Sequence, residues 1–186
     1  MTGKLFVLSG PSGAGKGTLR ELALKNFDSL VYSISCTTRQ PRNSETDGVE
    51  YRFITRENFE NRINNGEFLE YAHVHDNYYG TLKQDVINEL ERGNNVLLEI
   101  DVQGALQVRE KMPEAVLIFI APPSIEELEK RLRARHTETE ENLKLRLKNA
   151  EHEMNLQNEY NHVIINDDLN KAVNYLREIF IQEGCA

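Results

Sequence analysis

Residues 5–18 read LFVLSGPSGAGKGT, an apolar run that leads directly into a glycine-rich turn. The residues that follow, 19–24, form the helix-favouring run LRELAL. A short strand, a glycine-rich turn and a helix build a phosphate cradle, because backbone N–H groups converge on an anion at the positive end of the helix dipole. Lys16 can reach the outer phosphates. The pattern predicts a nucleoside triphosphate site formed by Gly10, Pro11, Ser12, Gly13, Ala14, Gly15, Lys16, Gly17 and Thr18.

The position after Lys16 holds Gly17, and the first hydroxyl follows one place later at Thr18. In the usual phosphate loop a Ser or Thr directly follows the lysine and faces Mg²⁺. The pattern therefore supports the phosphate site more strongly than a magnesium contact of Thr18. The alternative, a glycine-rich loop with a chance lysine, is disfavoured by the flanking strand and helix.

Composition excludes several classes of protein. The chain has 186 residues, 39% of them hydrophobic and 28% charged, which is typical of an ordinary globular domain. A net charge of −8 argues against a nucleic-acid polymer as the main partner. No apolar run reaches the length of a membrane span, the start does not have the pattern of a signal peptide, and Cys36 and Cys185 form no paired motif. We expect a cytoplasmic protein.

Three further apolar runs, 95–101, 115–121 and 162–165, are predicted to be buried strands. Their continuous apolarity is typical of a parallel sheet with both faces covered. Helices are predicted between them, with capping pairs Ser124/Glu127 and Thr137/Glu140, and a last helix that begins near residues 167–168. The sequence thus predicts a single α/β domain, residues 3–182, of the P-loop NTPase type, with helices on both faces of a parallel sheet.

Two segments depart from this alternation. Residues 33–82 are rich in polar turns and short β-like pieces, with one helix near 56–65 that ends at Gly66. We interpret them as an inserted mixed α/β lobe that binds a substrate. Residues 131–148, where arginines and glutamates crowd around a helix start, are predicted to form a helical lid.

Arg39 and Arg42 flank Pro41 inside the inserted segment. Proline restricts the local backbone, and guanidinium groups bind phosphate oxygens bidentately. Tyr51 and Tyr79 could add neutral donors to the same phosphate. The alternative is a solvated, charged loop, since surface arginines are common.

Glu70 and Asp101 form a possible base-reading pair. A guanine base presents N1–H and N2–H₂ donors that two carboxylates can accept, while Ser35 or Thr81 donates to its O6; adenine lacks this pattern. Taken alone, Glu70 could be a surface acid, and Asp101 a helix cap or a magnesium-associated acid. Glu99, two positions before Asp101 on the same strand face, could serve a metal through water.

A third set of residues is cationic. Arg131 and Arg135 lie one helical turn apart, and Arg146 follows on the next helical segment. They could close over a polyphosphate and neutralise charge in the transition state. Each could instead pair with a neighbouring glutamate.

With these motifs in place, the chain resembles the guanylate kinase family, of the bacterial type, over roughly residues 3–181. The run TTRQPRNSETDGVEYRF, residues 37–53, matches that family's signature position by position. Further blocks follow in the expected order, at residues 77–81 (NYYGT), 99–104 (EIDVQG), 119–124 (FIAPPS) and 163–168 (VIINDD).

The resemblance implies a nucleoside monophosphate kinase that converts MgATP and GMP to ADP and GDP. We expect no protein general base, because a phosphate monoester has a second pKa of about 6 and is already anionic at neutral pH. It implies four groups of residues: guanine readers Ser35, Glu70, Thr81 and Asp101; acceptor-phosphate ligands Arg39, Arg42, Tyr51 and Tyr79; lid and donor-phosphate arginines Arg131, Arg135 and Arg146; and adenine neighbours Asn166 and Asp167. Lys16, Arg39 and the three lid arginines are the expected catalytic residues, and Thr18 and Glu99 the candidate Mg²⁺ contacts. Another monophosphate kinase and a non-catalytic binding module remain as alternatives, and the chain could be a monomer or a homodimer.

Overall fold

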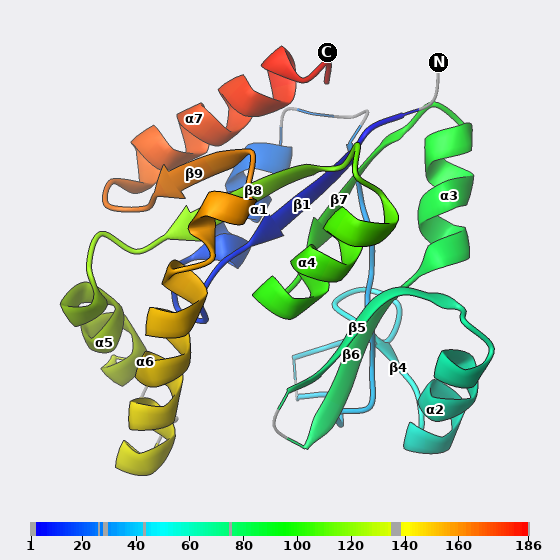
Figure 1. The fold of residues 1–186 in the computed structure, drawn as a ribbon, viewed down its shortest axis with the longest axis horizontal. Helices are drawn as coiled ribbons and strands as arrows, with labels where there is room; N and C mark the ends of the chain where they lie inside the picture. The colour runs from blue at the N-terminus through cyan, green and yellow to red at the C-terminus, as the bar shows by residue number, and fades with distance from the viewer. Residues whose placement is uncertain are drawn as a thin grey trace. The chain divides into compact units, whose positions relative to one another are not determined.

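The computed structural model describes residues 3–25, 27, 30–42, 44–74, 76–134 and 139–185. Strands and helices alternate along this part of the chain, so the predicted α/β class is confirmed (Figure 1). Within the described residues, one sheet has the strand order β2-β7-β1-β8-β9 and a second has the order β4-β3-β6-β5.

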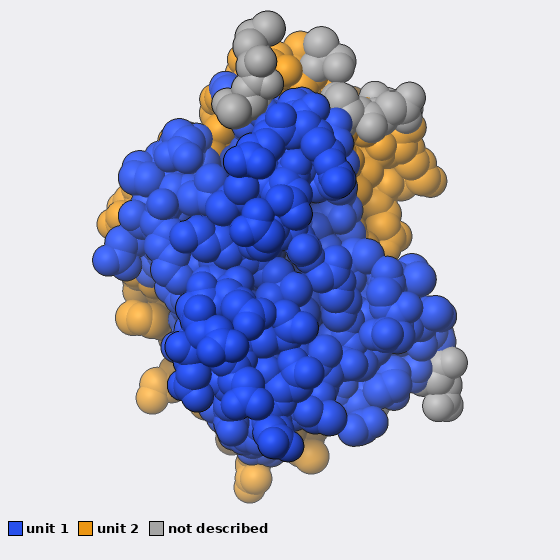
Figure 2. Space-filling model, turned by 90° about the vertical axis from the view of Figure 1, so that its right-hand side faces the viewer, with its two compact units in different colours: residues 1–6, 31–115 blue, residues 7–30, 116–186 orange. Residues whose placement is uncertain are grey.

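The chain divides into two compact units (Figure 2). Unit 1 comprises residues 1–6 and 31–115, and unit 2 comprises residues 7–30 and 116–186. The division falls within the first strand, β1 (Leu5–Ser9), whose five residues are all buried.

Unit 2 is built on the predicted buried strands. β8 (Val116–Ala121) is buried along its whole length and pairs in parallel with β9 (His162–Ile165). Helix α1 (Lys16–Leu24) packs against α7 (Leu169–Gln182). Helices α5 (Ile125–Arg133) and α6 (Glu140–Met154) share a small apolar cluster, and a short 3₁₀ helix, η1 (Gln157–Glu159), precedes β9.

Helices α5, α6 and α7 of unit 2 begin at side-chain caps. Ser124 accepts a hydrogen bond from the Glu127 N–H, as predicted, and Asp168 caps α7 by accepting one from Lys171 N–H. The cap of α6 is Thr139, which accepts a hydrogen bond from Asn142 N–H. Thr137, the predicted cap, lies outside the described residues.

Unit 1 contains the inserted segment. Its elements are β2 (Leu30–Tyr32, whose first residue falls in unit 2), β3 (Cys36–Thr37), β4 (Arg52–Phe53), α2 (Arg56–Asn64), β5 (Phe68–Val74), β6 (Asn77–Leu82), α3 (Lys83–Glu91), β7 (Asn95–Glu99) and α4 (Val102–Lys111). β3 pairs in parallel with β4 and antiparallel with β6, and β6 pairs antiparallel with β5. The predicted helix is present and ends before Gly66, whose φ is +67°. The long β5–β6 hairpin goes beyond the short β-like pieces that the sequence predicts.

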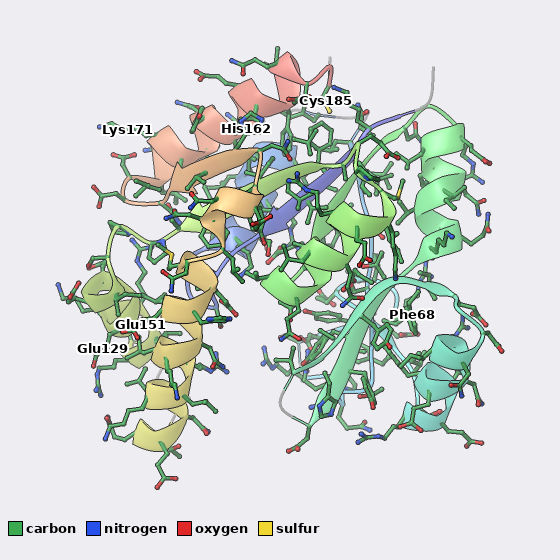
Figure 3. All side chains as sticks on the ribbon, in the orientation of Figure 1. Phe68, Glu129, Glu151, His162, Lys171 and Cys185 are labelled. Atoms are coloured by element: carbon green, nitrogen blue, oxygen red, sulfur yellow. The ribbon has the colours of Figure 1, made fainter. Side chains whose placement is uncertain are left out.

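Aromatic stacking holds α2 on this hairpin. Phe59 is fully buried and stacks on Phe68, with ring centroids 4.3 Å apart. Phe68 is labelled in Figure 3. On β6, Tyr78 stacks on Phe59 at 5.2 Å. These rings form the core of the inserted segment.

We predict that Phe59→Ala lowers the free energy of unfolding by about 3–5 kcal/mol, because it removes a fully buried ring and leaves a cavity. Glu60→Ala on the same helix is the control; its side chain is half exposed and pairs with Arg56, so its expected effect is below about 0.5 kcal/mol. Urea denaturation followed by circular dichroism measures both. Similar losses for the two variants would contradict a packed core at Phe59.

Candidate functional site

The phosphate loop of unit 2 runs between β1 and α1 and contains two glycines that no other residue could replace. Gly10 has φ +136°, and a Cβ there would lie 2.2 Å from the carbonyl oxygen of Ile120 on β8. Gly15 caps α1 with φ +94°, and a Cβ there would lie 2.4 Å from Nδ2 of Asn166. The loop is therefore pressed against β8 and the residue after β9, with its backbone N–H groups at the start of a helix.

Two cations meet this loop. Lys16 donates from Nζ to the carbonyl oxygens of Gly10 at 2.6 Å and Pro11 at 3.1 Å. Arg146 of α6 donates from Nη1 to Oγ of Ser12 at 3.1 Å. Both cations thus contact the loop directly, which favours binding of a polyphosphate there.

Asn166 joins the loop to a third cation. Its buried side-chain amide donates from Nδ2 to the carbonyl oxygen of Ala14 at 2.8 Å, and its backbone carbonyl oxygen accepts from Nη2 of Arg131 at 3.0 Å. Arg131 also donates from Nε to Glu127 at 3.2 Å. The structure therefore places Asn166 and Arg131 next to the loop.

The other residues predicted for unit 2 are placed as follows. Thr18 is exposed in the first turn of α1, and Asp167 is exposed between β9 and α7. Arg135 lies outside the described residues.

Unit 1 brings together the predicted acceptor-phosphate residues. The Arg39 guanidinium lies 5.6 Å from the ring centroid of Tyr51, and the rings of Tyr51 and Tyr79 are 5.9 Å apart. Arg39 donates to Glu45 at 2.8 Å, and the same carboxylate accepts from the backbone N–H of Arg42 at 2.8 Å. The hydrogen bond from Arg39 lowers the pKa of Glu45, so the acid stays ionised. Glu45 thereby organises the arginine loop, a role that the sequence analysis did not assign.

Two of the predicted base-reading residues, Glu70 and Thr81, lie on the β5–β6 hairpin. Glu70 pairs across the hairpin with Thr81, and its Oε1 accepts from the Thr81 hydroxyl at 2.6 Å. Glu70 is only 3% exposed, and this burial raises the pKa of its carboxyl from 4.5 to about 7; the Thr81 hydrogen bond lowers it and the charge of Asp101 raises it. Asp101 accepts from the backbone N–H of Gly104 at 2.8 Å as the N-cap of α4, so the cap alternative holds for it.

Ser35 and Glu99 are the remaining predicted site residues of unit 1. Ser35 is buried just before β3, and its carbonyl oxygen accepts from Arg52 N–H at 2.9 Å. Glu99 is the half-buried last residue of β7.

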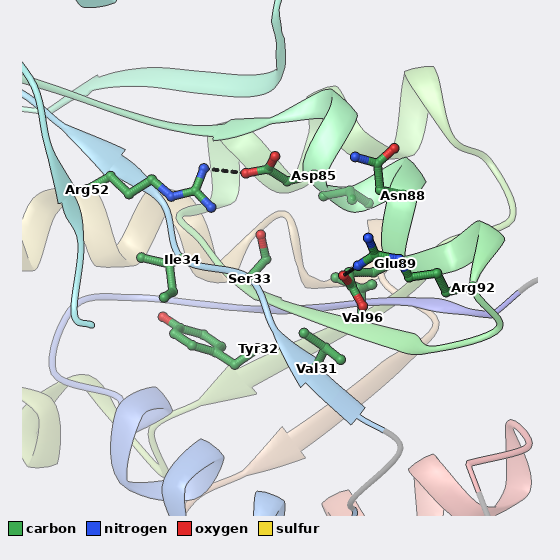
Figure 4. Close-up of a pocket in the computed structure, with 11 residues that line it drawn as sticks. Val31, Tyr32, Ser33, Ile34, Arg52, Asp85, Asn88, Glu89, Arg92 and Val96 are labelled. Atoms are coloured by element: carbon green, nitrogen blue, oxygen red, sulfur yellow. Dashed lines mark hydrogen bonds and ion pairs between the residues drawn. The ribbon is translucent and has the colours of Figure 1, made fainter. Parts of the chain in front are cut away.

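A pocket of about 270 Å³ lies elsewhere in unit 1, between β2 and α3 (Figure 4). None of the predicted site residues lines it. Its two arginines are each paired with an acid, Arg52 with Asp85 and Arg92 with Glu89, so it offers little attraction for an anion.

A parallel α/β sheet with a glycine-rich loop, a lysine and converging arginines defines a P-loop nucleotide-binding protein. The sequence model of the family "Guanylate kinase" matches residues 2–183. A protein named guanylate kinase from Caldanaerobacter subterraneus subsp. tengcongensis is 52% identical to the chain, over 98% of this chain and 89% of the relative. A second protein of that name, from Fusobacterium nucleatum, is 54% identical, over 98% of this chain and 97% of the relative. The crystal structure of guanylate kinase from Anaplasma phagocytophilum superposes with a TM-score of 0.81 at 34% identity, covering 100% of this chain and 88% of that one.

The chain belongs to the guanylate kinase family, so the family resemblance and the predicted P-loop fold are both confirmed. Among the described residues, no helix is long and apolar enough to cross a membrane.

We predict that Glu70→Gln changes how stability depends on pH. The folded-state pKa of Glu70, about 7, lies above its value of 4.5 in the unfolded chain, so the folded state binds the extra proton and loses stability as pH rises between these values. Glutamine keeps an acceptor for the Thr81 hydroxyl and has no proton to lose. From pH 5 to pH 8 the variant should therefore gain about 1–3 kcal/mol relative to the parent, measured by urea denaturation at both pH values. A difference that does not change with pH would contradict the raised pKa.

Proposed function

We propose that this chain transfers the γ-phosphoryl group of MgATP to GMP and releases ADP and GDP. The observation that carries the proposal is the buried Glu70 carboxylate of unit 1, in a member of the guanylate kinase family whose phosphate loop keeps its lysine. An acid with so little access to water needs hydrogen-bond donors, and the N1–H and N2–H₂ groups of guanine supply them.

Guanine selection would rest on Glu70 and Asp101 as acceptors, with Ser35 and Thr81 as donors to O6. Adenine has no donor at N1 and carries its amino group elsewhere, so it would leave the acids unpaired in a buried site. Such losses can separate two bases by orders of magnitude.

The acceptor phosphate would be bound by Arg39, Arg42, Tyr51 and Tyr79. The bonds from Glu45 hold the arginine loop in place before the substrate arrives, which reduces the entropy lost on binding. A phosphate monoester has a second pKa of about 6, so its oxygen is already anionic at neutral pH. No protein general base is needed. The acceptor oxygen forms a bond to the γ-phosphorus as the bond from that phosphorus to the β–γ bridging oxygen of ATP breaks, which leaves ADP.

The donor phosphates would be bound by the loop N–H groups of residues 10–18 and by Lys16. Arg131, Arg135 and Arg146 would neutralise the charge that develops on the transferred group, and Asn166 and Asp167 would lie beside the adenine. Because two highly charged phosphates must be brought together, most of the catalysis would come from alignment and charge neutralisation.

Magnesium would arrive with ATP. Among the described residues, no group of three His, Cys, Asp or Glu side chains could hold a metal ion, so phosphate and water oxygens would be most of its ligands. The exposed hydroxyl of Thr18 and the carboxylate of Glu99, through water, are the protein groups proposed to assist. The bound ion supplies charge neutralisation across the phosphates.

We further propose that residues 33–82 act as a GMP-binding lobe and residues 131–148 as a lid, both within one guanylate kinase-like domain of residues 3–182. The partners are the two small-molecule substrates and not a nucleic-acid polymer or a membrane. The proposed location is the cytoplasm, where purine nucleotides are recycled, and the protein would work as a monomer or a homodimer.

A coupled assay of ADP formation with four acceptors, GMP, AMP, UMP and dTMP, tests the function. We expect kcat/KM for GMP to exceed the others by at least about 100-fold, because the site is built to pair the donors of guanine. A better rate with another acceptor would indicate a different monophosphate kinase. Binding of ATP and GMP without ADP formation would indicate a binding module.

We predict that Lys16→Met lowers kcat by about 10²–10³-fold while the thermal midpoint changes little, because the ammonium acts on the phosphates and not in a core. Lys171→Met, at an exposed position on α7, is the matched control and should keep the parent rate (Figure 3). A Lys16 variant with the parent kcat would remove this residue from the mechanism.

A further inference from the structure

Helix α4 of unit 1 is bonded to the free edge of β5, the terminal strand of the four-stranded sheet. The side-chain amide of Gln107 forms two hydrogen bonds with Tyr71: its Nε2 donates to the Tyr71 carbonyl oxygen at 2.7 Å, and its Oε1 accepts from the Tyr71 N–H at 3.2 Å. Lys111 donates from Nζ to the carbonyl oxygen of Leu69 at 2.6 Å. The backbone on both sides of Glu70 is therefore held by side chains of α4.

A third position of α4 meets the Glu70 side chain itself. Gly104 lies in the first turn of the helix, and a Cβ there would be 2.4 Å from Oε2 of Glu70 and 3.3 Å from Oδ1 of Asp101. The backbone of Gly104 has ordinary helical geometry, so its conformation does not require glycine. Alanine is the better helix former, and the Glu70 carboxylate is the nearest atom group that it would strike.

Gly104, Gln107 and Lys111 are spaced three and four residues apart, which places them on one face of α4. We propose that this face positions the Glu70 carboxylate for reading guanine and thereby sets the selectivity of the enzyme for its acceptor base. The inference rests on the proposed function. The three are positioning residues: they act through Glu70, and the structure gives them no separate chemical role.

The burial of Glu70 makes such positioning effective. At 3% exposure, water cannot replace a hydrogen bond that a displaced carboxylate fails to make. The groups that face Glu70 are the Thr81 hydroxyl on β6, the Asp101 carboxylate at the start of α4 and the Lys111 ammonium near its end. A shift of the carboxylate would weaken contact with the 2-amino group of guanine, which is the group that distinguishes GMP from IMP.

Gly104→Ala tests the steric part of the proposal, with Glu110→Ala, at an exposed position of the same helix, as its control. We expect kcat/KM for GMP to fall at least tenfold and its ratio to kcat/KM for IMP to fall at least fivefold. The KM for ATP should stay within twofold of the parent. An unchanged GMP-to-IMP ratio would overturn the proposal.

The parent protein is assayed first, so that two kinds of failure are distinguishable. A parent that does not phosphorylate GMP contradicts the proposed function. A parent that does so, with a Gly104 variant of equal selectivity, contradicts only the positioning role. If the Gly104 variant does not fold, Gln107→Met decides the question, because it adds no atom beside Glu70: a lower GMP-to-IMP ratio supports the proposal and an unchanged ratio overturns it.

Lys111→Met supplies a readout that a purely structural role would not move. The positive charge of Lys111 lowers the pKa of Glu70, so its removal should move the pH at which 1/KM for GMP is half-maximal upward by about 0.3–1 unit. Lys111→Arg should restore the parent midpoint, and the titration of GMP itself is common to all variants. An unchanged midpoint in Lys111→Met would overturn the role of this residue.

Discussion

The phosphate loop can approach β8 and Asn166 as closely as it does only because Gly10 and Gly15 carry no side chain. Both sites have positive φ and a partner atom within 2.5 Å of where a Cβ would stand. This close approach fixes the loop backbone against two segments that are more than 100 residues away in the sequence. Three cations of unit 2 form hydrogen bonds with this region: Lys16 with loop carbonyls, Arg146 with Ser12 and Arg131 with Asn166. The anion site is thus a property of the tertiary packing of unit 2 as much as of its glycine-rich motif.

In unit 1 the proposed site contains both acids and a cation. Its proposed base-reading groups, Glu70 and Asp101, are carboxylates, while its proposed phosphate-binding groups include the Arg39 guanidinium. The structure pairs the Arg39 guanidinium with a local acid, Glu45, and buries Glu70 in the β5–β6 hairpin. A net charge of −8 is compatible with an anionic substrate because Lys16, Arg131 and Arg146 lie at the phosphate loop.

The sequence predicted those parts of the structure that depend on interactions between residues close together in the chain. The apolar run of β8, the cap Ser124 and the helix end at Gly66 all depend on residues within a few positions of each other. Asp101 was assigned three alternative roles, a base reader, a helix cap or a magnesium-associated acid, and the structure shows that it caps α4. A cap uses one carboxylate oxygen, so the base-reading role stays a prediction.

The unpredicted parts are contacts between residues distant in the sequence. The register that sets Glu70 opposite Thr81 depends on the hairpin turn and a bulge after Phe68, neither of which has a clear sequence signal. The bonds of Gln107 to Tyr71 join positions 36 residues apart, and a glutamine on a helix gives no indication of its partner. Glu45 lies in the quoted signature, but its bond to Arg39 follows from the fold of the loop.

At the buried position of Glu70, the proposed function and the stability of the fold favour different side chains. Glutamine would fill the same volume, bond to Thr81 and avoid the desolvation of a charge. It would, however, offer guanine one carbonyl oxygen and an amino group, and the amino group would face the N1–H and N2–H₂ donors of the base. Only an ionised carboxylate presents two acceptors to two donors. If guanine is the ligand, the protein must therefore keep an acid where its own stability favours an amide. Burial raises the pKa of that acid, whereas the Thr81 hydrogen bond and the charge of Lys111 lower it and so favour the ionised form that guanine would need.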